Sequence, residues 1–333
     1  LSWLLLPPGG ADEAAFVPGV SVAAVTSLRH AVETWKRLPS VEALRPVSHA
    51  DHPGEDVPDM RDVRGQALAR RALEVAAAGG HNLLLVGPPG SGKTMLALRF
   101  PGLLPDLSTE ESLEVSRIYS AAGAVRGQPG PIRRPPFRAP HHSVTLAGLV
   151  GGGAQLRPGE VTLAHRGVLF LDELPEFRPE CLEALRQPLE QGEITLSRYP
   201  QTCTFPARFL LIAAANPCPC GFLGDPYEEC RCRGAGLARY AARLSGPLAD
   251  RIDIHLRVER VPPGELAGLA ADPCGGEESA AIRERVAEAR LRQAHRYGKP
   301  GLWNGHLDRT GIAAHCRLEG RARALLAAGA RTL

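Results

Sequence analysis

Long apolar runs are missing from this sequence, and both cysteine and net charge are scarce. No run reaches the roughly 18 to 20 apolar residues that a membrane-spanning helix needs. The opening "LSWLLLPPGG" has no basic start and runs into Pro-Gly, which is not the pattern of a signal peptide. A formal net charge of +3 is too small to indicate nucleic-acid binding by itself. Eight cysteines in 333 residues exclude a disulfide scaffold and, without a secretion signal, favour a reducing, cytoplasmic setting.

Two further features are absent at the ends of the chain. The sequence has no initiator Met and stops at "AAGARTL" without a closing element, so we expect a fragment of a longer protein. There is no internal repeat, but the composition changes twice. "RPVSHADHPGEDVPDM" is typical of an extended linker, and the chain turns rich in Ala, Arg and Glu from about residue 263. We therefore expect three parts: 1–45, 46–262 and a helical 263–333.

Three continuously apolar segments predict the central fold: "NLLLVG", "GVLFLDEL" and "FLLIAAAN". Their lack of alternation indicates strands buried on both faces, as in a parallel sheet covered by helices. "DVRGQALARRALEVAAAGG" predicts a helix closed by two glycines before the first of them. Near the start, "LSWLLLP" predicts a strand and "SVAAVTSLRHAVETWKRL" has helical spacing. The expected fold class is α/β.

The stretch "GPPGSGKT" matches the pattern G-x-x-x-x-G-K-[ST] in full, between an apolar strand and the helix-forming "TMLALRF". Glycines in this context let backbone N–H groups surround phosphate oxygens. The lysine then neutralises the β- and γ-phosphates, and the threonine holds Mg²⁺. We predict a nucleotide site formed by Gly87, Pro88, Pro89, Gly90, Ser91, Gly92, Lys93 and Thr94.

About 80 residues later, the strand segment "GVLFLDEL" ends in two adjacent carboxylates. Asp172 is predicted to hold Mg²⁺ through water, and Glu173 to polarise the attacking water. An isolated Asp-Glu pair is often only a solvated acidic turn, but its place after a full phosphate loop favours the catalytic interpretation. The two motifs together predict a nucleotide hydrolase.

Two later residues fit a system that senses the γ-phosphate. Asn216 ends the strand segment "FLLIAAAN", where a neutral amide can orient the attacking water. Arg251, in "GPLADRIDIHL", stands where it can reach a neighbouring subunit's nucleotide and stabilise charge in the transition state. Each alone is more often a strand-end cap or a surface ion pair. Their order after the two phosphate motifs supports the functional interpretation.

Four of the eight cysteines fall within "NPCPCGFLGDPYEECRC", as two C-x-C pairs. Two close pairs of thiolates can form a tetrahedral zinc site. The usual spacing is C-x₂-C, however, and a one-residue gap points the two side chains apart unless a turn at Pro219 brings them together. Structural zinc, unmetallated thiols and disulfides all remain open for Cys218, Cys220, Cys230 and Cys232.

The motif order, together with "HPGEDVPDMRDVRGQ", "FRAPHHSVTLAGLVGGG", "NPCPCG" and "GPLADRIDIH", resembles the YifB/ComM group of magnesium-chelatase-like AAA+ ATPases. The likeness covers nearly the whole chain. It implies an AAA+ P-loop core over 46–262, ATP and Mg²⁺ as cofactors, and a hexameric ring with ATP at the subunit boundaries. It also implies that 1–45 end a Lon-protease-like domain and that 263–333 begin a helical lid, which continues to a sensor-2 arginine beyond this sequence.

The resemblance leaves three functional interpretations open. Members of the ComM type are DNA helicases that promote branch migration during natural transformation, which favours a motor that remodels DNA here. Others carry the name of the motor subunit that serves Mg²⁺ insertion into porphyrin, which suggests a motor acting on a protein partner. The Lon-like segment suggests an ATP-dependent protease as a third interpretation.

Two segments are candidates for DNA contact in such a ring. Prolines make the first part of "PIRRPPFRAPHHSVTLAGLVGGG" extended. "QGEITLSRYPQTCTFPARF" predicts a β-hairpin, which in ring motors of this class points into the pore. Phe137 is the only stacking candidate in the first segment, so we expect contact with the DNA backbone rather than sequence readout. Both segments are also compatible with ordinary surface loops. The candidates are Arg133, Arg134, Arg138, His141, His142 and Arg198.

Overall fold

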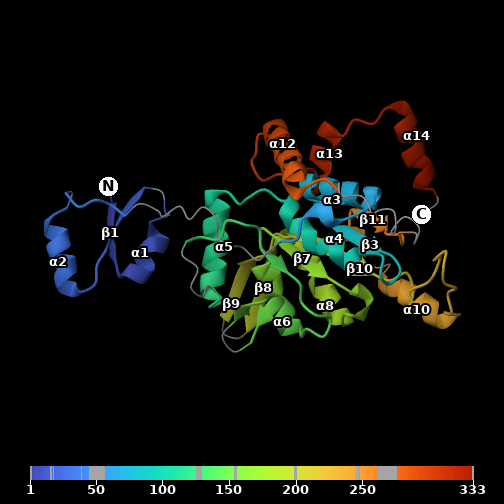
Figure 1. Cartoon of the computed structure of the whole chain (residues 1–333), viewed down its shortest axis with the longest axis horizontal. Coiled ribbons are helices and arrows are strands. Elements are labelled where there is room, and N and C mark those ends of the chain that lie inside the picture. Colours follow the sequence, from blue (N-terminus) through green and yellow to red (C-terminus); the bar gives the residue numbers. More distant parts are fainter. Residues whose placement is uncertain are drawn as a thin grey trace.

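The computed structural model describes residues 2–15, 17, 19–38, 40–44, 57–124, 130–153, 156–198, 201–244, 246, 248–261 and 276–331. Figure 1 shows a mixed α/β structure whose central sheet carries helices on both faces. The two predicted domain boundaries, 45/46 and 262/263, lie outside the described residues.

The N-terminal unit pairs two parallel strands and adds two helices: β1 (Ser2–Leu6), α1 (Pro8–Ala14), β2 (Val20–Ala24) and α2 (Leu28–Lys36). The predicted opening strand is confirmed. The helical pattern over 21–38 is confirmed only from Leu28 onward, and its first residues form β2 instead. Val22 is buried there, and β-branched residues favour strands. Ser27 then starts the helix, because its Oγ accepts a hydrogen bond from the His30 N–H at 3.1 Å.

Five parallel strands form the central sheet in the order β11-β3-β10-β7-β4. Their bounds are β3 (Leu83–Val86), β4 (Phe137–Arg138), β7 (Val168–Leu171), β10 (Leu210–Ala215) and β11 (Ile254–Arg257). The three segments predicted as buried strands are β3, β7 and β10. They are direct neighbours, and Ile212 of β10 lies opposite Leu83 on one side and Phe170 on the other. The structure is the expected α/β P-loop core with a parallel sheet.

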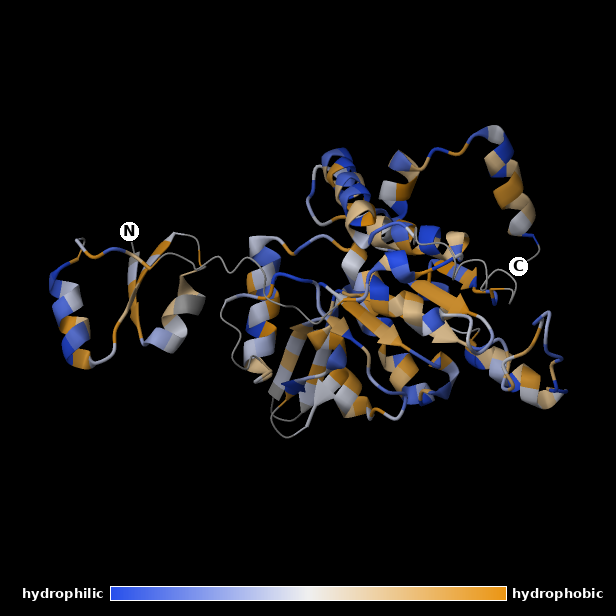
Figure 2. Cartoon of the chain, in the orientation of Figure 1, coloured by the Kyte–Doolittle hydropathy of each residue, from blue (hydrophilic) through white to orange (hydrophobic). Residues whose placement is uncertain are grey.

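Side chains of the three inner strands, β3, β7 and β10, alternate between two apolar clusters, one on each face of the sheet. On β7, Val168 and Phe170 belong to one cluster and Leu169 and Leu171 to the other, because successive side chains of a strand point to opposite faces. Figure 2 shows the inner strands of the central sheet as hydrophobic. Helices cover both clusters: α3 (Ala67–Gly79), α4 (Lys93–Arg99) and α12 (Ser279–Tyr297) on the first, and α6 (Leu146–Val150) and α8 (Pro179–Ala184) on the second. Burial on both faces explains the missing alternation.

A short hairpin precedes β10: β8 (Glu193–Arg198) pairs antiparallel with β9 (Gln201–Pro206). Buried Ile194 anchors its base in the second apolar cluster, and the hydroxyls of Thr195 and Thr204 lie 3.1 Å apart across it. The hairpin prediction is confirmed, while residues 199 and 200 and the side chain of Arg198 lie outside what is described. The predicted C-terminal helical region consists of α12, α13 (Arg309–His315) and α14 (Gly320–Gly329).

Helix α3 begins later than its sequence pattern indicates, because Gly65 and Gln66 both have a left-handed backbone, with φ of 65° and 50°. Its predicted glycine end is confirmed, with Gly80 at φ 70°. The remaining described elements connect those above: η1 (Met60–Asp62), η2 (Phe100–Leu103), α5 (Thr109–Ala121), β5 (Gly151–Gly152), β6 (Arg157–Pro158), α7 (Glu160–Leu163), η3 (Leu174–Glu176), α9 (Arg186–Gln191), α10 (Ala235–Leu244), η4 (Ala249–Arg251) and η5 (Asn304–His306).

Candidate nucleotide-binding site and cysteine cluster

The phosphate loop, the acidic pair and Asn216 come from three neighbouring strands. The loop at 87–94 follows β3, the acidic pair follows β7, and Asn216 follows β10. Parallel strands bring their carboxyl ends to one edge of the sheet, which is where ligands bind in such folds. The Gly87 N–H donates to the Ala215 carbonyl at 3.1 Å, so the loop is fixed to the end of β10. The structure therefore brings these predicted site residues together.

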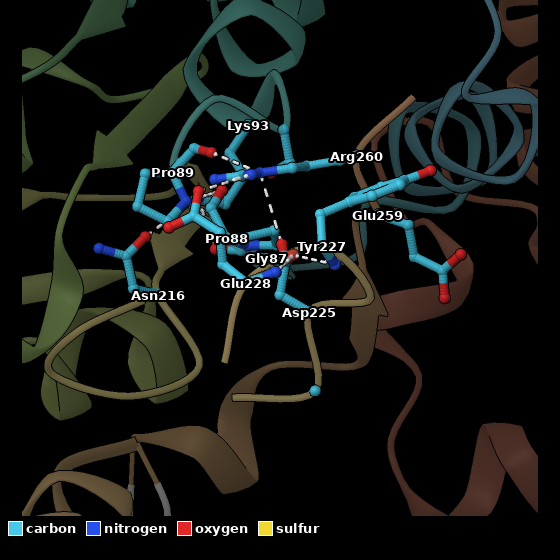
Figure 3. Close-up of polar contacts among 12 residues, drawn as sticks. Gly87, Pro88, Pro89, Lys93, Asn216, Asp225, Tyr227, Glu228, Glu259 and Arg260 are labelled. Carbon is cyan, nitrogen blue, oxygen red and sulfur yellow. Dashed lines mark hydrogen bonds and ion pairs between the residues drawn. The ribbon is translucent and has the colours of Figure 1, made fainter. Parts of the chain in front are cut away.

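Lys93 is a buried charged residue of this site, with only 8% of the residue exposed. Its ammonium donates to the carbonyls of Gly87 and Pro88 at 2.7 and 2.9 Å and to Asn216 Oδ1 at 3.2 Å (Figure 3). Burial lowers the pKa of Lys93, whereas the nearby acidic pair acts in the opposite direction. A cation held inside the loop in this way is placed to meet an anionic ligand that enters it.

The groups predicted to hold Mg²⁺ also meet, because Thr94 Oγ1 donates to Asp172 Oδ2 at 2.7 Å. Ser91 Oγ is buried in the same loop and has no hydrogen-bond partner among the described residues. A Cβ on Gly87 would lie 2.2 Å from the Val258 carbonyl, so the loop requires glycine at its first position. Mg²⁺ prefers oxygen ligands and shares them with substrate phosphates. The residues present therefore fit Mg²⁺ and a nucleotide phosphate.

Glu173 has a left-handed backbone, with φ 51°, at the turn between β7 and η3. Such a conformation is uncommon for a residue other than glycine and occurs often at functional sites. The His142 Nδ1 lies 3.2 Å from Glu173 Oε2. His142 follows β4, the strand beside β7, so two loops at the same sheet edge meet here. The sequence placed His142 among the DNA candidates and gave no sign of this contact.

Two residues that the sequence did not single out donate hydrogen bonds to backbone carbonyls of the site. The Tyr240 hydroxyl donates to the Asn216 carbonyl at 3.1 Å, and burial raises the pKa of Tyr240 to about 12, so the phenol stays a donor. Gln66 Nε2 donates to the carbonyls of Ser91 and Glu259 at 3.3 and 2.6 Å, which links the phosphate loop to the segment after β11. A tyrosine or a glutamine alone does not indicate a nucleotide site. Only Gln66 could have been found from the sequence, because it ends the string "DVRGQ" that belongs to the family resemblance.

The four clustered cysteines meet in space, because their sulfur atoms all lie within 4.8 Å of one another. All four are free thiols, so the disulfide alternative is not what the structure shows. The Cys218 sulfur lies 3.4 Å from that of Cys220 and 3.7 Å from that of Cys230, and the last two are also 3.7 Å apart. Four sulfurs placed tetrahedrally at about 2.3 Å from zinc are about 3.8 Å from each other. Three of the four sulfurs therefore already have nearly the spacing of a tetrathiolate metal site, and the Cys232 sulfur lies within 4.8 Å of each of them.

A turn at Pro219 overcomes the unfavourable C-x-C spacing. The Gly221 N–H donates to the Cys218 carbonyl at 2.9 Å, and Pro219 takes the second position of this turn, which its fixed φ suits. The backbone N–H groups of Phe222 and Arg231 lower the pKa of Cys220 to about 6, which favours its thiolate form. Burial and the neighbouring thiols raise the pKa of Cys230, and they raise that of Cys232 to about 12. A thiolate is the form that binds metal.

Arg251 lies near the amino-terminal ends of the parallel strands, whereas the phosphate loop follows the carboxyl-terminal end of β3. Its carbonyl accepts a hydrogen bond from Asn82 Nδ2 at 2.9 Å, and Asn82 directly precedes β3, whereas the loop follows that strand. Its Nε donates to Glu190 Oε1 at 2.8 Å. The backbone position separates Arg251 from the nucleotide site of its own chain, as a trans-acting arginine requires.

The DNA candidates fall into two groups. Arg133, Arg134 and His141 are exposed. Arg138, in contrast, makes a bidentate ion pair with Glu160 at 2.6 and 2.8 Å, and is half-buried. His142 likewise lies beside a carboxylate, that of Glu173. Arg138 and His142 are therefore not part of an exposed basic surface that could bind DNA.

Comparison with known families gives the site its context. Residues 59–266, which contain every motif of this sheet edge, match the family described as magnesium chelatase, subunit ChlI. The chain belongs to this magnesium chelatase family. Residues 276–333 match its C-terminal part, described as magnesium chelatase, subunit ChlI C-terminal. The expected AAA+ P-loop core with a C-terminal helical region is thereby confirmed.

Three curated relatives of this magnesium chelatase family member are similar to it over most of its length. An uncharacterized protein of Mycobacterium tuberculosis is 49% identical over 300 residues, which are 90% of this chain and 58% of that protein. YifB of Escherichia coli is 48% identical over 299 residues (90% and 55%), and the competence protein ComM of Haemophilus influenzae is 42% identical over 318 residues (95% and 61%). The predicted likeness to the YifB/ComM group is confirmed. The chain spans about three fifths of the length of these relatives.

Among the helices of the described residues, none combines the length and the apolar character needed to cross a bilayer.

Proposed function

We propose that the chain hydrolyses ATP with Mg²⁺ at the carboxyl edge of its sheet. One observation carries this proposal: residues that follow three neighbouring strands form two polar contacts at the carboxyl ends of those strands. Lys93 donates a hydrogen bond to Asn216, and Thr94 donates one to Asp172. Family membership supports it, since the magnesium chelatase family is of the AAA+ ATPase type.

Each side chain has one role in this proposal. Backbone N–H groups of residues 87–94 and the Lys93 ammonium bind the phosphates, and Thr94 with Asp172 holds Mg²⁺, which stabilises charge on the phosphate oxygens when bound. Glu173 accepts a proton from the attacking water, and Asn216 orients that water. Lys93 and Asn216 already touch at 3.2 Å, so the residue that binds phosphate and the residue that senses it respond to the same ligand.

The proposal includes a ring of identical subunits, hexameric by family resemblance, in which Arg251 completes a neighbour's site. The position of Arg251 at the far sheet edge supports action in trans. We also propose that residues 1–45 end a Lon-like domain, that 46–262 form the ATPase core, and that 263–333 begin the lid.

We further propose that the ring binds and remodels DNA without reading its sequence. Exposed Arg133 and Arg134 support this, as does the competence protein ComM among the relatives. The test is ATP hydrolysis by the complete protein with single-stranded DNA, with branched DNA and without DNA. Stimulation by DNA supports the proposal. Equal rates, together with no salt-dependent DNA binding, would instead favour a motor that acts on a protein partner.

A double variant tests the DNA surface itself. Arg133→Ala with Arg134→Ala is expected to weaken binding to single-stranded DNA and to reduce the slope of log affinity against log salt by about 1.4, or about 0.7 per lost phosphate contact. The matched control is Arg321→Ala with Arg323→Ala, two exposed arginines of α14. Fluorescence anisotropy over a salt series gives both slopes. Equal slopes for the two double variants would remove Arg133 and Arg134 from the proposed surface.

The four clustered thiols are proposed to bind Zn²⁺ as a structural centre in the cytoplasm. Their spacing supports a closed tetrahedral site, and an all-sulfur tetrahedral set favours zinc or an iron–sulfur cluster. A reducing compartment keeps such thiols free for metal. Four ligands from the chain leave no open position, so the centre would not take part in ATP chemistry directly.

A further inference from the structure

The cysteine segment packs directly against the phosphate loop. Gly221, one residue after Cys220, has φ 88°, and a Cβ placed there would lie 2.6 and 2.8 Å from ring atoms Cδ and Cγ of Pro89. Pro89 is the third residue of the phosphate loop. Both the left-handed backbone and the close approach require glycine at this position. The turn that gathers the first two thiols therefore rests on the loop that would hold the nucleotide.

One arginine joins the same two segments through polar contacts. Arg260 Nε donates to the Pro89 carbonyl at 3.3 Å and lies 3.4 Å from Asp225 Oδ2, and Nη1 donates to Glu228 Oε1 at 3.1 Å (Figure 3). Its guanidinium also lies over the Phe222 ring, 5.4 Å from the centroid. Three of these four partners stand between Cys220 and Cys230, so Arg260 connects the middle of the cysteine segment to Pro89.

The central partner of Arg260 is a carboxylate with no exposed surface. The Asp225 side chain is 0% exposed, and its Oδ1 accepts hydrogen bonds from the backbone N–H groups of Tyr227 and Glu228 at 2.8 and 2.9 Å. Burying a carboxylate is costly unless it is paired and hydrogen-bonded. The turn at 225–228 and the position of Arg260 are therefore fixed by each other.

The cysteine segment has little regular structure with which to keep this shape. The described residues from Asn216 to Gly234 contain no helix or strand, although they connect β10 to α10. Loops longer than about 15 residues without regular structure are uncommon in compact domains and often have a function. A metal held by two thiols from each end would close the segment, because structural metal binding contributes folding free energy.

We propose that metal binding at the four thiols fixes the position of Pro89 and thereby sets the affinity of the phosphate loop for nucleotide. The metal site and the nucleotide site are coupled through Gly221 and Arg260, although the metal touches no phosphate. Thermodynamic coupling is reciprocal, so bound nucleotide slows the loss of metal to a chelator. This inference rests on the proposed metal centre and on the proposed nucleotide site.

The test compares nucleotide affinity in three forms of the purified chain: as isolated, stripped by a zinc-selective chelator, and reloaded with Zn²⁺, with Mg²⁺ constant throughout. Metal content is measured by mass spectrometry and affinity with a fluorescent ATP analogue. We expect one zinc per chain, an affinity about tenfold lower after stripping, within the 5- to 150-fold range of coupled sites, and recovery on reloading. The exposed-thiol variant Cys316→Ser is the control and should match the wild type in both measurements.

Arg260→Ala removes the contact between Arg260 and Pro89 but leaves the four metal-binding thiols in place. This variant is expected to keep one zinc and still bind ATP about tenfold more weakly, and its zinc should no longer be protected by nucleotide. The matched control is Arg233→Ala, which removes the same charge from an exposed arginine just after the last of the four cysteines and should bind zinc and ATP as the wild type does. Because Arg260→Ala retains the metal-binding residues, zinc content also reports whether the segment is folded.

Three results of these measurements would contradict the zinc centre, the coupling and the ATP site separately. A chain without metal would overturn the zinc centre, and the coupling with it. A metal-loaded chain that binds ATP equally well after stripping, or an Arg260→Ala variant with unchanged affinity, would overturn the coupling and leave the centre standing. A metal-loaded wild type that binds no nucleotide would overturn the proposed ATP site instead.

Discussion

Replacing Glu173 with glutamine is expected to lower ATP turnover by about 10²- to 10⁴-fold, the usual contribution of a general base, while ATP binding stays nearly unchanged. Glutamine keeps the size of the side chain and one acceptor oxygen but cannot accept the proton of the attacking water. The phosphate-binding groups, Lys93 and Thr94, are untouched by the change. Steady-state phosphate release and equilibrium binding of Mg²⁺·ATP measure the two quantities separately.

Glu176 provides the matched control for this variant. It is an exposed glutamate three residues further along, at the end of η3. Glu176→Gln removes the same charge from the same turn and is expected to leave turnover within about twofold of the wild type, because exposed charges contribute little. Unchanged hydrolysis in Glu173→Gln, or equal losses in both variants, would refute the catalytic role of Glu173.

The second large effect is expected at Arg251. Arg251→Ala should reduce turnover by about 10³- to 10⁵-fold, as the loss of other arginines that stabilise phosphoryl-transfer charge does. The loss should be complemented in mixed rings. A subunit with Arg251→Ala keeps an intact phosphate loop, and a subunit with Lys93→Ala keeps its arginine, so the junction of the two contains one complete site.

Mixing the two inactive variants is therefore expected to restore part of the ATPase activity, with a maximum near equal amounts. Arg292→Ala is the matched control, since Arg292 is an arginine of α12 that also pairs with a glutamate, Glu288. That variant should retain full turnover. If mixtures are no more active than the separate variants, Arg251 does not act across a subunit boundary.

The central sheet could be predicted from the sequence because its strands carry a strong and local signal. Continuous apolar runs such as "NLLLVG" have one favourable location, a sheet covered on both faces, and the structure places them there. The glycine-rich loop and the acidic pair followed from the strands that precede them. The structure places them at the ends of β3 and β7, and their roles in nucleotide binding and catalysis stay predictions.

The sequence was less informative where structure depends on distant partners. Residues 21–24 have spacing compatible with a helix, but pairing of β2 with β1 stabilises a strand instead. His142 stands in a basic segment and yet contacts Glu173, because β4 and β7 are neighbours in the sheet, a pairing that no local pattern encodes. Arg260 is about 170 residues from Pro89 in sequence, so its link to the phosphate loop could not be predicted.

The cysteine cluster has one feature that the sequence could indicate and one that it could not. The C-x-C spacing argued against a common metal site, and the turn at Pro219 was the condition that could reverse this. The structure contains that turn, and the four sulfurs gather. The packing of the same turn against Pro89 through Gly221 is a tertiary contact, and it gives the cluster a functional connection that spacing alone could not suggest.

The most direct test of the account is the affinity of the chain for Mg²⁺·ATP, measured by isothermal titration for the wild type and for Lys93→Ala. The ammonium is buried against the loop carbonyls and Asn216, so its removal takes away the cation that meets the phosphates. We predict saturable binding by the wild type and a loss of about a hundredfold or more in the variant, as for other buried charge pairs. No binding by the metal-loaded wild type, or equal affinity in both proteins, would contradict the account.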